Sequence, residues 1–301
     1  MFKPILAIPA LTLLAVTPCW LPGDGVAAGE CDPPRPEHWL FCDDFSQSPD
    51  ASRYFQYSDG DGSFRWSESA GIGARHLVGD RGEDGAMVAR WRTGQVDAGS
   101  LKLLIGDNPL SELAIDTAGR QLREIYYRHY FRLSPGWNGN PHKLSRATIL
   151  VDRNWSQAMI AHLWGGRDQR LVVDPVSCVL RGGREPVCRG YNDFPNMRWL
   201  GKAAGVTPVH TMEQADQWHC VEAAVSLNDQ GFANGYQEFW LNGEPEAAAI
   251  GLDFVGDYRG YGINALFIEN WWNGGAPGER SRVIDNLVVA TGRIGCLLEG
   301  R

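Results

Sequence analysis

Positive charge is scarce in this chain, which has 28 Lys and Arg residues against 36 Asp and Glu, a formal net charge of −8. Because duplex binding depends on cationic contacts with phosphate, this deficit argues against a nucleic-acid-binding protein. Beyond the N-terminus no apolar run reaches the ~18 residues of a membrane-spanning helix, so we expect no membrane span. Helical periodicity is also nearly absent, which argues against a helical fold.

Several motifs that would identify an enzyme class are missing. We find no CxxC or HExxH zinc pattern, no phosphate-binding loop, no dinucleotide fingerprint and no serine-hydrolase elbow. The run Asp59–Ser63 begins like a calcium loop, but Phe64 replaces the required glycine, so we interpret it as a turn. We therefore expect no cofactor for catalysis.

The N-terminus has the layout of a secretory signal. Residues Met1–Ala28 contain an early Lys3, an apolar stretch over Ile5–Val16 and the small residues Val26-Ala27-Ala28. A charged start, a short apolar region and a small-residue cleavage site are typical of export signals. We predict cleavage before Gly29 and a secreted or periplasmic protein.

Six cysteines follow this segment: Cys31, Cys42, Cys178, Cys188, Cys220 and Cys296. An even number in an exported chain predicts three disulfides, although sequence alone does not select one connectivity. Spacing favours two local pairs, Cys31–Cys42 and Cys178–Cys188, which leaves Cys220 for Cys296.

Short runs rich in β-branched and aromatic residues, bounded by Gly, Pro, Asn and Asp, recur along the chain. They cover Trp39–Phe45, Ala86–Trp91, Glu124–Leu133, Arg146–Val151, Ser156–Trp164, Arg170–Val173, Trp218–Leu227, Tyr236–Leu241, Asn264–Asn270 and Arg282–Ala290. This pattern predicts an all-β fold. So many antiparallel strands must close or stack to protect their edges, so we expect one monomeric domain, Gly29–Arg301, folded as a two-sheet antiparallel jelly-roll β-sandwich.

Ordered motifs carry a resemblance to a known superfamily. They are Phe41-Cys-Asp-Asp-Phe45, Tyr126–Leu133 followed by Ser-Pro-Gly-Trp137, His142-Lys-Leu144, Trp218–Glu222, Asn234–Gly243, Trp272–Gly275 and Ile284–Gly295. In this order they resemble the concanavalin A-like lectin/glucanase β-sandwich, in particular its secreted, polysaccharide-lyase-like branch. The resemblance spans nearly the whole chain after the signal. It implies a polysaccharide partner, although the fold also carries lectins, glycosidases and binding modules.

The carboxylates argue against a retaining glucanase. Hydrolases of this fold place two or three carboxylates on alternate positions of one strand, whereas Tyr236-x-Glu238-x-Trp240 offers only one. A lyase needs different groups: a base that removes the proton α to a uronate carboxylate, a cation or donor that stabilises the enolate, and an acid for the leaving oxygen.

The stretch Arg120–Arg146 concentrates positive charge. Strand alternation places Tyr126, Arg128, Tyr130 and Arg132 on one face, and Tyr127, His129 and Phe131 on the other. The first face suits sugar stacking and bidentate binding of a carboxylate, so we expect Arg128 to contact an acidic sugar in the groove. The alternative is a solvated convex strand.

Two histidines are candidate bases. Alginate lyases of this fold carry Gln-Ile-His on a strand, whereas Ile160 and Ala161 precede His162 here, so the neutralising Gln is missing. The resemblance implies His162 or His129 as base, Arg128 as neutraliser, and Lys143 with Tyr258 or Tyr261 as assisting groups. A core histidine and packing tyrosines are the alternative.

Two further sets of residues complete the candidates. The run Trp271-Trp272-Asn273 precedes a glycine-rich turn that would let a ligand approach closely, although large aromatics also fill sandwich cores. Asp43, Asp44 and Asp285 belong to the first and last predicted strands. The resemblance implies a structural Ca²⁺ there, and turn capping is the alternative.

These observations favour a lyase that cleaves a uronate-containing polysaccharide by β-elimination. A non-catalytic lectin is the second hypothesis, supported by the missing Gln. An envelope protein of the same fold that binds no sugar is the third.

Overall fold

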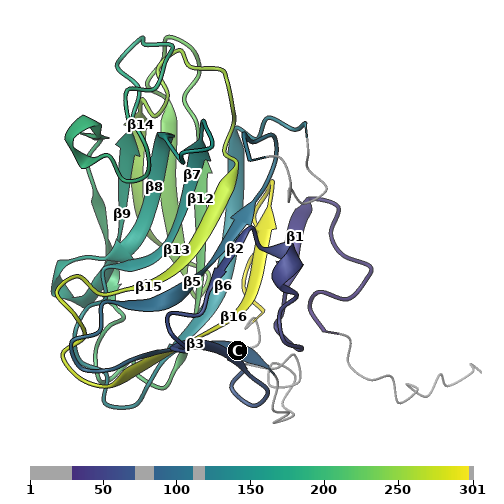
Figure 1. Ribbon diagram of the computed structural model, residues 1–301, viewed down its shortest axis with the longest axis vertical. Helices are drawn as coiled ribbons and strands as arrows, with labels where there is room; N and C mark the ends of the chain where they lie inside the picture. Colours follow the sequence, from purple (N-terminus) through teal and green to yellow (C-terminus); the bar gives the residue numbers. More distant parts are fainter. Residues whose placement is uncertain (1–28, 72–84, 111–118, 298–301) are drawn as a thin grey trace, which may run out of the picture.

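A computed structural model describes residues 29–71, 85–110 and 119–297. The expected signal segment Met1–Ala28 lies outside these residues. Two antiparallel sheets of eight strands each account for the architecture (Figure 1), which confirms the predicted all-β jelly-roll sandwich. No helix in the described part of the chain is long and apolar enough to cross a membrane.

The first sheet, called sheet A below, has the order β14-β13-β12-β6-β16-β4-β3, and β1 also pairs with β16. Its strands are β1 (Trp39–Asp43), β3 (Phe64–Ser67), β4 (Ala86–Trp91), β6 (Glu124–Leu133), β12 (Trp218–Ser226), β13 (Gly235–Leu241), β14 (Glu244–Leu252) and β16 (Arg280–Ala290). The N-terminal strand β1 thus lies beside the last strand, as Figure 1 shows in purple and yellow.

The second sheet, called sheet B, has the order β10-β9-β8-β7-β15-β5-β2, and β11 also pairs with β9. Its strands are β2 (Gln56–Ser58), β5 (Asp97–Leu104), β7 (Lys143–Leu150), β8 (Gln157–Gly165), β9 (Arg170–Ser177), β10 (Arg198–Trp199), β11 (Ala203–Pro208) and β15 (Ala265–Trp271). Among the described residues, short 3₁₀ helices lie at Ala51–Arg53, Arg167–Gln169 and Phe194–Asn196.

Alternate residues of the strands form the core between the sheets. Tyr127 and Phe131 of β6 belong to the same buried cluster as Ala147 and Ile149 of β7, and as Leu163 of β8. Successive side chains of a strand point to opposite faces, so the residues between these face away from the core. Each sheet therefore has one outer face on which functional side chains can lie.

A charged side chain, Arg282 of β16, also lies in this core and is fully buried. Its Nη2 donates to the Asn270 Oδ1 at 2.6 Å and to the carbonyl of Glu269 at 2.6 Å, and it lies 3.3 Å from the carbonyl of Lys143. The pairing of β15 with β7 shifts register between Ile268 and Trp271, so the carbonyls that Arg282 binds lie at this irregularity. Arg282 thus connects sheet A to the end of β7 and β15.

His129 is buried beside it, and neither ring nitrogen has a hydrogen-bond partner. Burial, reinforced by the charges of Arg282 and Arg128, lowers the pKa of His129 to about 3. The expectation that His129 might act as a base is wrong in this fold, because the ring lies between the sheets and no substrate reaches it.

The three disulfides favoured by spacing are present. Cys31 pairs with Cys42, Cys178 with Cys188, and Cys220 with Cys296, with Cα–Cα distances of 5.5, 5.4 and 6.0 Å. The third bond ties β12 to the segment after β16, across a sequence separation of 76 residues.

Replacing both Cys220 and Cys296 by Ala removes the constraint on the longest loop. We expect the free energy of unfolding to fall by up to about 4 kcal/mol, because the unfolded chain regains loop entropy. Urea denaturation followed by tryptophan fluorescence measures this loss. An unchanged unfolding midpoint would contradict the assigned bond.

Arg282→Met removes the buried guanidinium and leaves the amide of Asn270 and two carbonyls without a donor. Because unpaired buried acceptors are costly, we expect a loss of about 3 kcal/mol in unfolding free energy. The same denaturation experiment tests it, with exposed Arg35→Met as control. A variant as stable as the wild type would show that Arg282 does not hold the sheets together.

Candidate active site

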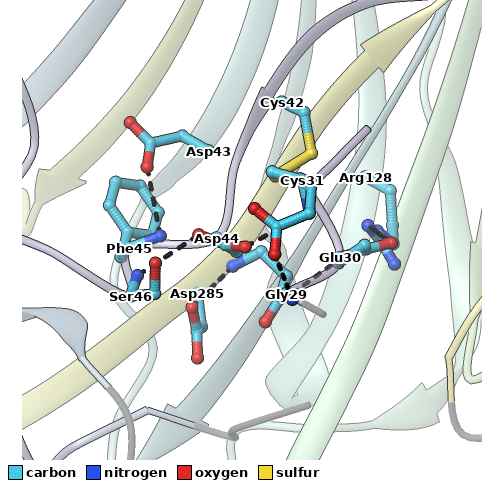
Figure 2. The surroundings of a disulfide bond; sticks show 12 residues. Gly29, Glu30, Cys31, Cys42, Asp43, Asp44, Phe45, Ser46, Arg128 and Asp285 are labelled. Atoms are coloured by element: carbon cyan, nitrogen blue, oxygen red, sulfur yellow. Dashed lines mark hydrogen bonds and ion pairs between the residues drawn. A yellow bond between two sulfur atoms is a disulfide. The ribbon is translucent and has the colours of Figure 1, made fainter. Parts of the chain in front are cut away.

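Arg128 lies on the outer face of sheet A and not in a groove with His162, which belongs to β8 of sheet B. Its side chain is 1% exposed, and its Nη2 lies 2.5 Å from the Glu30 Oε1 (Figure 2). The other Glu30 oxygen accepts a hydrogen bond from the Asn286 Nδ2 at 2.8 Å. The expected contact of Arg128 with an acidic sugar is therefore wrong, because a carboxylate of the same chain already covers the guanidinium.

The residues expected to flank Arg128 share this face. The Tyr130 hydroxyl accepts a hydrogen bond from the Leu297 N–H at 2.5 Å, and the Arg132 guanidinium lies over the Trp218 ring. The Tyr126 hydroxyl lies 3.4 Å from the Tyr236 hydroxyl. Alternation along the strand was predicted correctly, but all these side chains lie on the other side of the sandwich from His162.

Three other candidates occupy places that do not suit their expected roles. Trp272 is buried in the core against Trp91 and Trp137. Tyr258 is also buried, and burial raises its pKa above the ordinary value of a tyrosine. Tyr261 packs partly buried against the core, and neither tyrosine shares a hydrogen bond or ring contact with His162. The structure therefore does not bring them to one site.

The three acids proposed for calcium lie near the N-terminal segment (Figure 2). Asp43 accepts a hydrogen bond from the Tyr54 hydroxyl at 2.7 Å and pairs with Arg53, while Asp44 accepts from the N–H groups of Cys31 and Ser46. Asp285 accepts from the N–H of Asn286. Within residues 29–71, 85–110 and 119–297, no group of three or more His, Cys, Asp or Glu could hold a metal ion. Calcium binding stays a prediction.

His162 lies on the outer face of sheet B, together with several charged and aromatic residues. Arg146 of β7 is its cross-strand partner, Phe267 of β15 is the next partner, and Lys102 of β5 follows. Directly opposite residues in neighbouring strands have side chains on the same face. This row, with Glu269, Lys143 and Trp164, is called the His162 face below.

The tautomer of His162 is fixed by its hydrogen bond. Nδ1 lies 3.1 Å from the backbone carbonyl of Asp174. Because a carbonyl only accepts, Nδ1 carries the proton, and Nε2 of the neutral ring keeps its lone pair. No described residue forms a hydrogen bond with Nε2. This nitrogen is also not one of the fully buried atoms without a partner, so it has some contact with solvent. Burial, with the charge of Arg146, lowers the pKa of His162 to about 3, so the ring is neutral near pH 7. At neutral pH the Nε2 lone pair is unprotonated, and so low a pKa makes the ring a weak base.

Two tryptophan rings stack with the imidazole of His162. The Trp164 ring stacks on the imidazole at 4.3 Å with 10° between the planes, and Trp199 lies nearly parallel, 5.9 Å from His162. Trp199 is 43% exposed. Trp199 is the exposed ring of this stack and is therefore the candidate for stacking on a sugar ring.

Charge on the His162 face is organised around Glu269. Its Oε1 lies 2.9 Å from the Arg146 Nη2 and 3.5 Å from the Lys143 Nζ, and accepts from the Tyr191 hydroxyl at 3.3 Å. Burial alone would raise the pKa of Glu269, but Arg146 and Lys143 lower it, so the carboxylate is ionised. Arg146 also donates to the Asn192 Oδ1 at 2.9 Å.

Lys102 adds a third cation to this face. Its ammonium lies over the rings of Trp155 and Phe267, and burial together with the neighbouring cations lowers its pKa to about 8. Three cations, Lys102, Lys143 and Arg146, thus surround one carboxylate. Asp174, the cross-strand partner of His162 on β9, is a second acid on this face. Three cations against two acids leave an excess of one positive charge, in a chain whose net charge is −8.

A cleft of about 350 Å³ adjoins Trp164 and is lined by Asn140, His142, Arg167, Asp174, Lys202 and Asn273 among others. The backbone N–H of Asn273 donates to the His142 Nδ1 at 3.1 Å, so Nε2 carries the proton of the neutral ring. Burial lowers the pKa of His142, which favours that neutral form. Asn273 also accepts from the indole of Trp271, and Lys143 lies over the Trp271 ring at 4.7 Å. Of the predicted binding residues, Asn273 lines this cleft and Trp271 is hydrogen-bonded to Asn273.

Sequence reasoning missed Arg146, Glu269, Lys102, Tyr191 and Trp199 as site residues. Arg146 stands at the end of the basic stretch that was noticed, but nothing local distinguishes it from Arg128. The distinction depends on which strands pair with each other, and a single sequence does not show that.

The tautomer of His162 can be tested directly. We expect ¹⁵N NMR to show Nδ1 protonated and Nε2 unprotonated, and to show no protonation near the ordinary histidine pKa of about 6.5, because burial disfavours the charged ring. His162→Ala assigns the resonance. Titration of His162 with a pKa near 6.5 would contradict the buried, neutral arrangement.

Comparisons with known proteins support the fold. No protein-family model and no curated protein matches the chain. Among solved structures, an endo-β-1,4-glucuronan lyase from the fungus Trichoderma reesei matches with 14% identity and a TM-score of 0.53, covering 84% of this chain and 96% of its own. A PL-14 alginate lyase from Aplysia kurodai matches with 11% identity and a TM-score of 0.56, covering 84% and 99%. The chain therefore has the β-sandwich fold of these polysaccharide lyases.

Proposed function

We propose that the protein is a polysaccharide lyase that cleaves a uronate-containing glycan by β-elimination on the His162 face. The observation that carries the proposal is the neutral His162, whose Nδ1 is held by a carbonyl while Nε2 is free to accept a proton. The positive excess around Glu269 supports an acidic substrate, and the likeness in fold to lyases agrees with it.

The reaction needs three groups, and this part of the molecule offers each. The Nε2 of His162 takes the proton α to the uronate carboxylate, the electron pair of that C–H bond forms the double bond, and the β C–O bond breaks. Lys143, 17% exposed and beside Glu269, stabilises the charge that develops on the carboxylate. The Nε2–H of His142 is the candidate donor for the leaving oxygen.

Incubation with a panel of polyuronates tests this proposal. We expect the ultraviolet absorbance of an unsaturated uronate to appear with the wild type, and to fall at least about 100-fold in rate for His162→Ala, because a general base is lost. His38→Ala is the matched control, since His38 is an exposed histidine that contacts the backbone of Arg293 near sheet A. Equal rates for both variants would overturn His162 as base.

A lectin without catalytic activity is the second candidate. Ile160 stands on the same strand face where the alginate lyases that the sequence resembles carry a neutralising Gln, and it is buried. The parallel rings of Trp164 and Trp199 would serve sugar binding without chemistry. Binding of a glycan without any unsaturated product would favour this alternative.

A further inference from the structure

A second cleft lies at the ends of two strands of sheet A. Its volume is about 560 Å³, and it is lined by Arg90 and Arg92 around the end of β4 and by Arg280 at the start of β16. Arg90 is the cross-strand partner of Ser281, and Arg280 is the partner of Trp91. None of these residues belongs to the His162 face, which sheet B presents.

The three arginines have no carboxylate partner. No ion pair joins any of them to an acid in the part of the chain that the structure describes, whereas Arg128, Arg146 and Arg198 each have one. Glu279 is the single acid that lines the cleft. Arg280 donates to the backbone carbonyl of Glu279 at 2.7 Å, and its Nε is buried without a partner. The lining of this cleft therefore has three arginines against one acid, and Arg92 also lines a neighbouring opening with Asp61 and Asp97.

Two serine hydroxyls in the same cleft can donate hydrogen bonds. The Ser63 Oγ accepts a hydrogen bond from the Gln95 Nε2 at 2.7 Å, and the Ser134 Oγ accepts from the N–H of Ser281 at 3.1 Å. Since a hydroxyl both donates and accepts, each keeps its own hydrogen for another acceptor. Arg90 shares the strand face of Ser281, whereas Arg280, on the alternate face, lines the cleft at the start of β16. Arginines and hydroxyl donors that line one opening are suited to binding an oxyanion.

We propose that this cleft binds a carboxylate of an acidic polysaccharide and holds the polymer outside the active site. A chain of net charge −8 repels a polyanion except where cations gather, and this cleft is such a place on sheet A. The choice of an acidic polysaccharide rests on the proposed function, whereas the oxyanion chemistry of the cleft does not.

Calorimetric titration with a soluble polyuronate tests the site, using His162→Ala as the background so that the polymer stays intact. Adding Arg90→Gln and Arg280→Gln should weaken binding about tenfold and reduce its dependence on salt, because two charge-assisted contacts are lost. The matched control adds Arg35→Gln and Arg184→Gln, two exposed arginines without an ion pair, and should change the Kd less than twofold.

If the variant with Arg90→Gln and Arg280→Gln binds the polyuronate as tightly as the control variant does, the site is overturned. Equally tight binding of a neutral β-glucan would overturn it too. Thermal melting followed by circular dichroism checks the fold. If the double variant does not fold, Arg92→Gln alone replaces it, since Arg92 is exposed, and is expected to weaken binding about threefold.

Failure of this site and failure of the proposed function give different results. A wild-type chain that yields no unsaturated product, while the double variant still loses binding, keeps the cleft and overturns the lyase. A chain that yields product while the double variant binds normally overturns the cleft alone.

Discussion

The guanidinium of Arg282 lies between the two sheets without a carboxylate partner. The arrangement of the molecule depends on the neutral acceptors that bind its N–H groups. It binds the side chain of Asn270 and the carbonyl of Glu269. Burial lowers its pKa to about 9, so the group is charged at neutral pH. A buried charge needs every donor satisfied, which fixes the positions of the acceptors. The side chains that emerge from the same residues, Glu269 and Lys143, are thereby held on the outer face of sheet B.

The two outer faces of the sandwich differ in what covers them. On sheet A, Glu30 of the N-terminal segment covers Arg128, while the segment after β16 binds Tyr130 and Glu222 through its backbone N–H groups. The charges of Arg128 and Glu222 are thus neutralised by the chain itself. On sheet B, His162 has an unpaired Nε2 and its tryptophan neighbours are partly exposed. A substrate can approach the second face, and the chain already occupies much of the first.

The strand pattern, the sandwich and the disulfide pairs could be predicted from local features, because alternation and cysteine spacing are properties of short segments. The faces within β6 were also predicted, since Tyr127 and Phe131 do enter the core. The choice between Arg128 and Arg146 could not be made, because each stands in an alternating strand of a basic stretch. The two arginines differ in their carboxylate partners. Arg128 pairs with Glu30, 98 residues away, and Arg146 pairs with Glu269, 123 residues away. Such long-range pairing follows from strand order, which local chemistry does not determine.

The ion pair between Glu30 and Arg128 adjoins the bond between Cys31 and Cys42, and this proximity links the completion of the fold to oxidation. In a reducing cytosol the segment that carries Glu30 would be held without a covalent bond, by the ladder of β1 with β16 and by the contacts of Glu30 with Arg128 and Asn286. Whenever that segment detaches, Arg128 loses both its carboxylate and the cover that keeps water away from it, so the buried ion pair is lost. Heterologous production is therefore expected to succeed in an oxidising compartment and to give a partly open sheet A elsewhere.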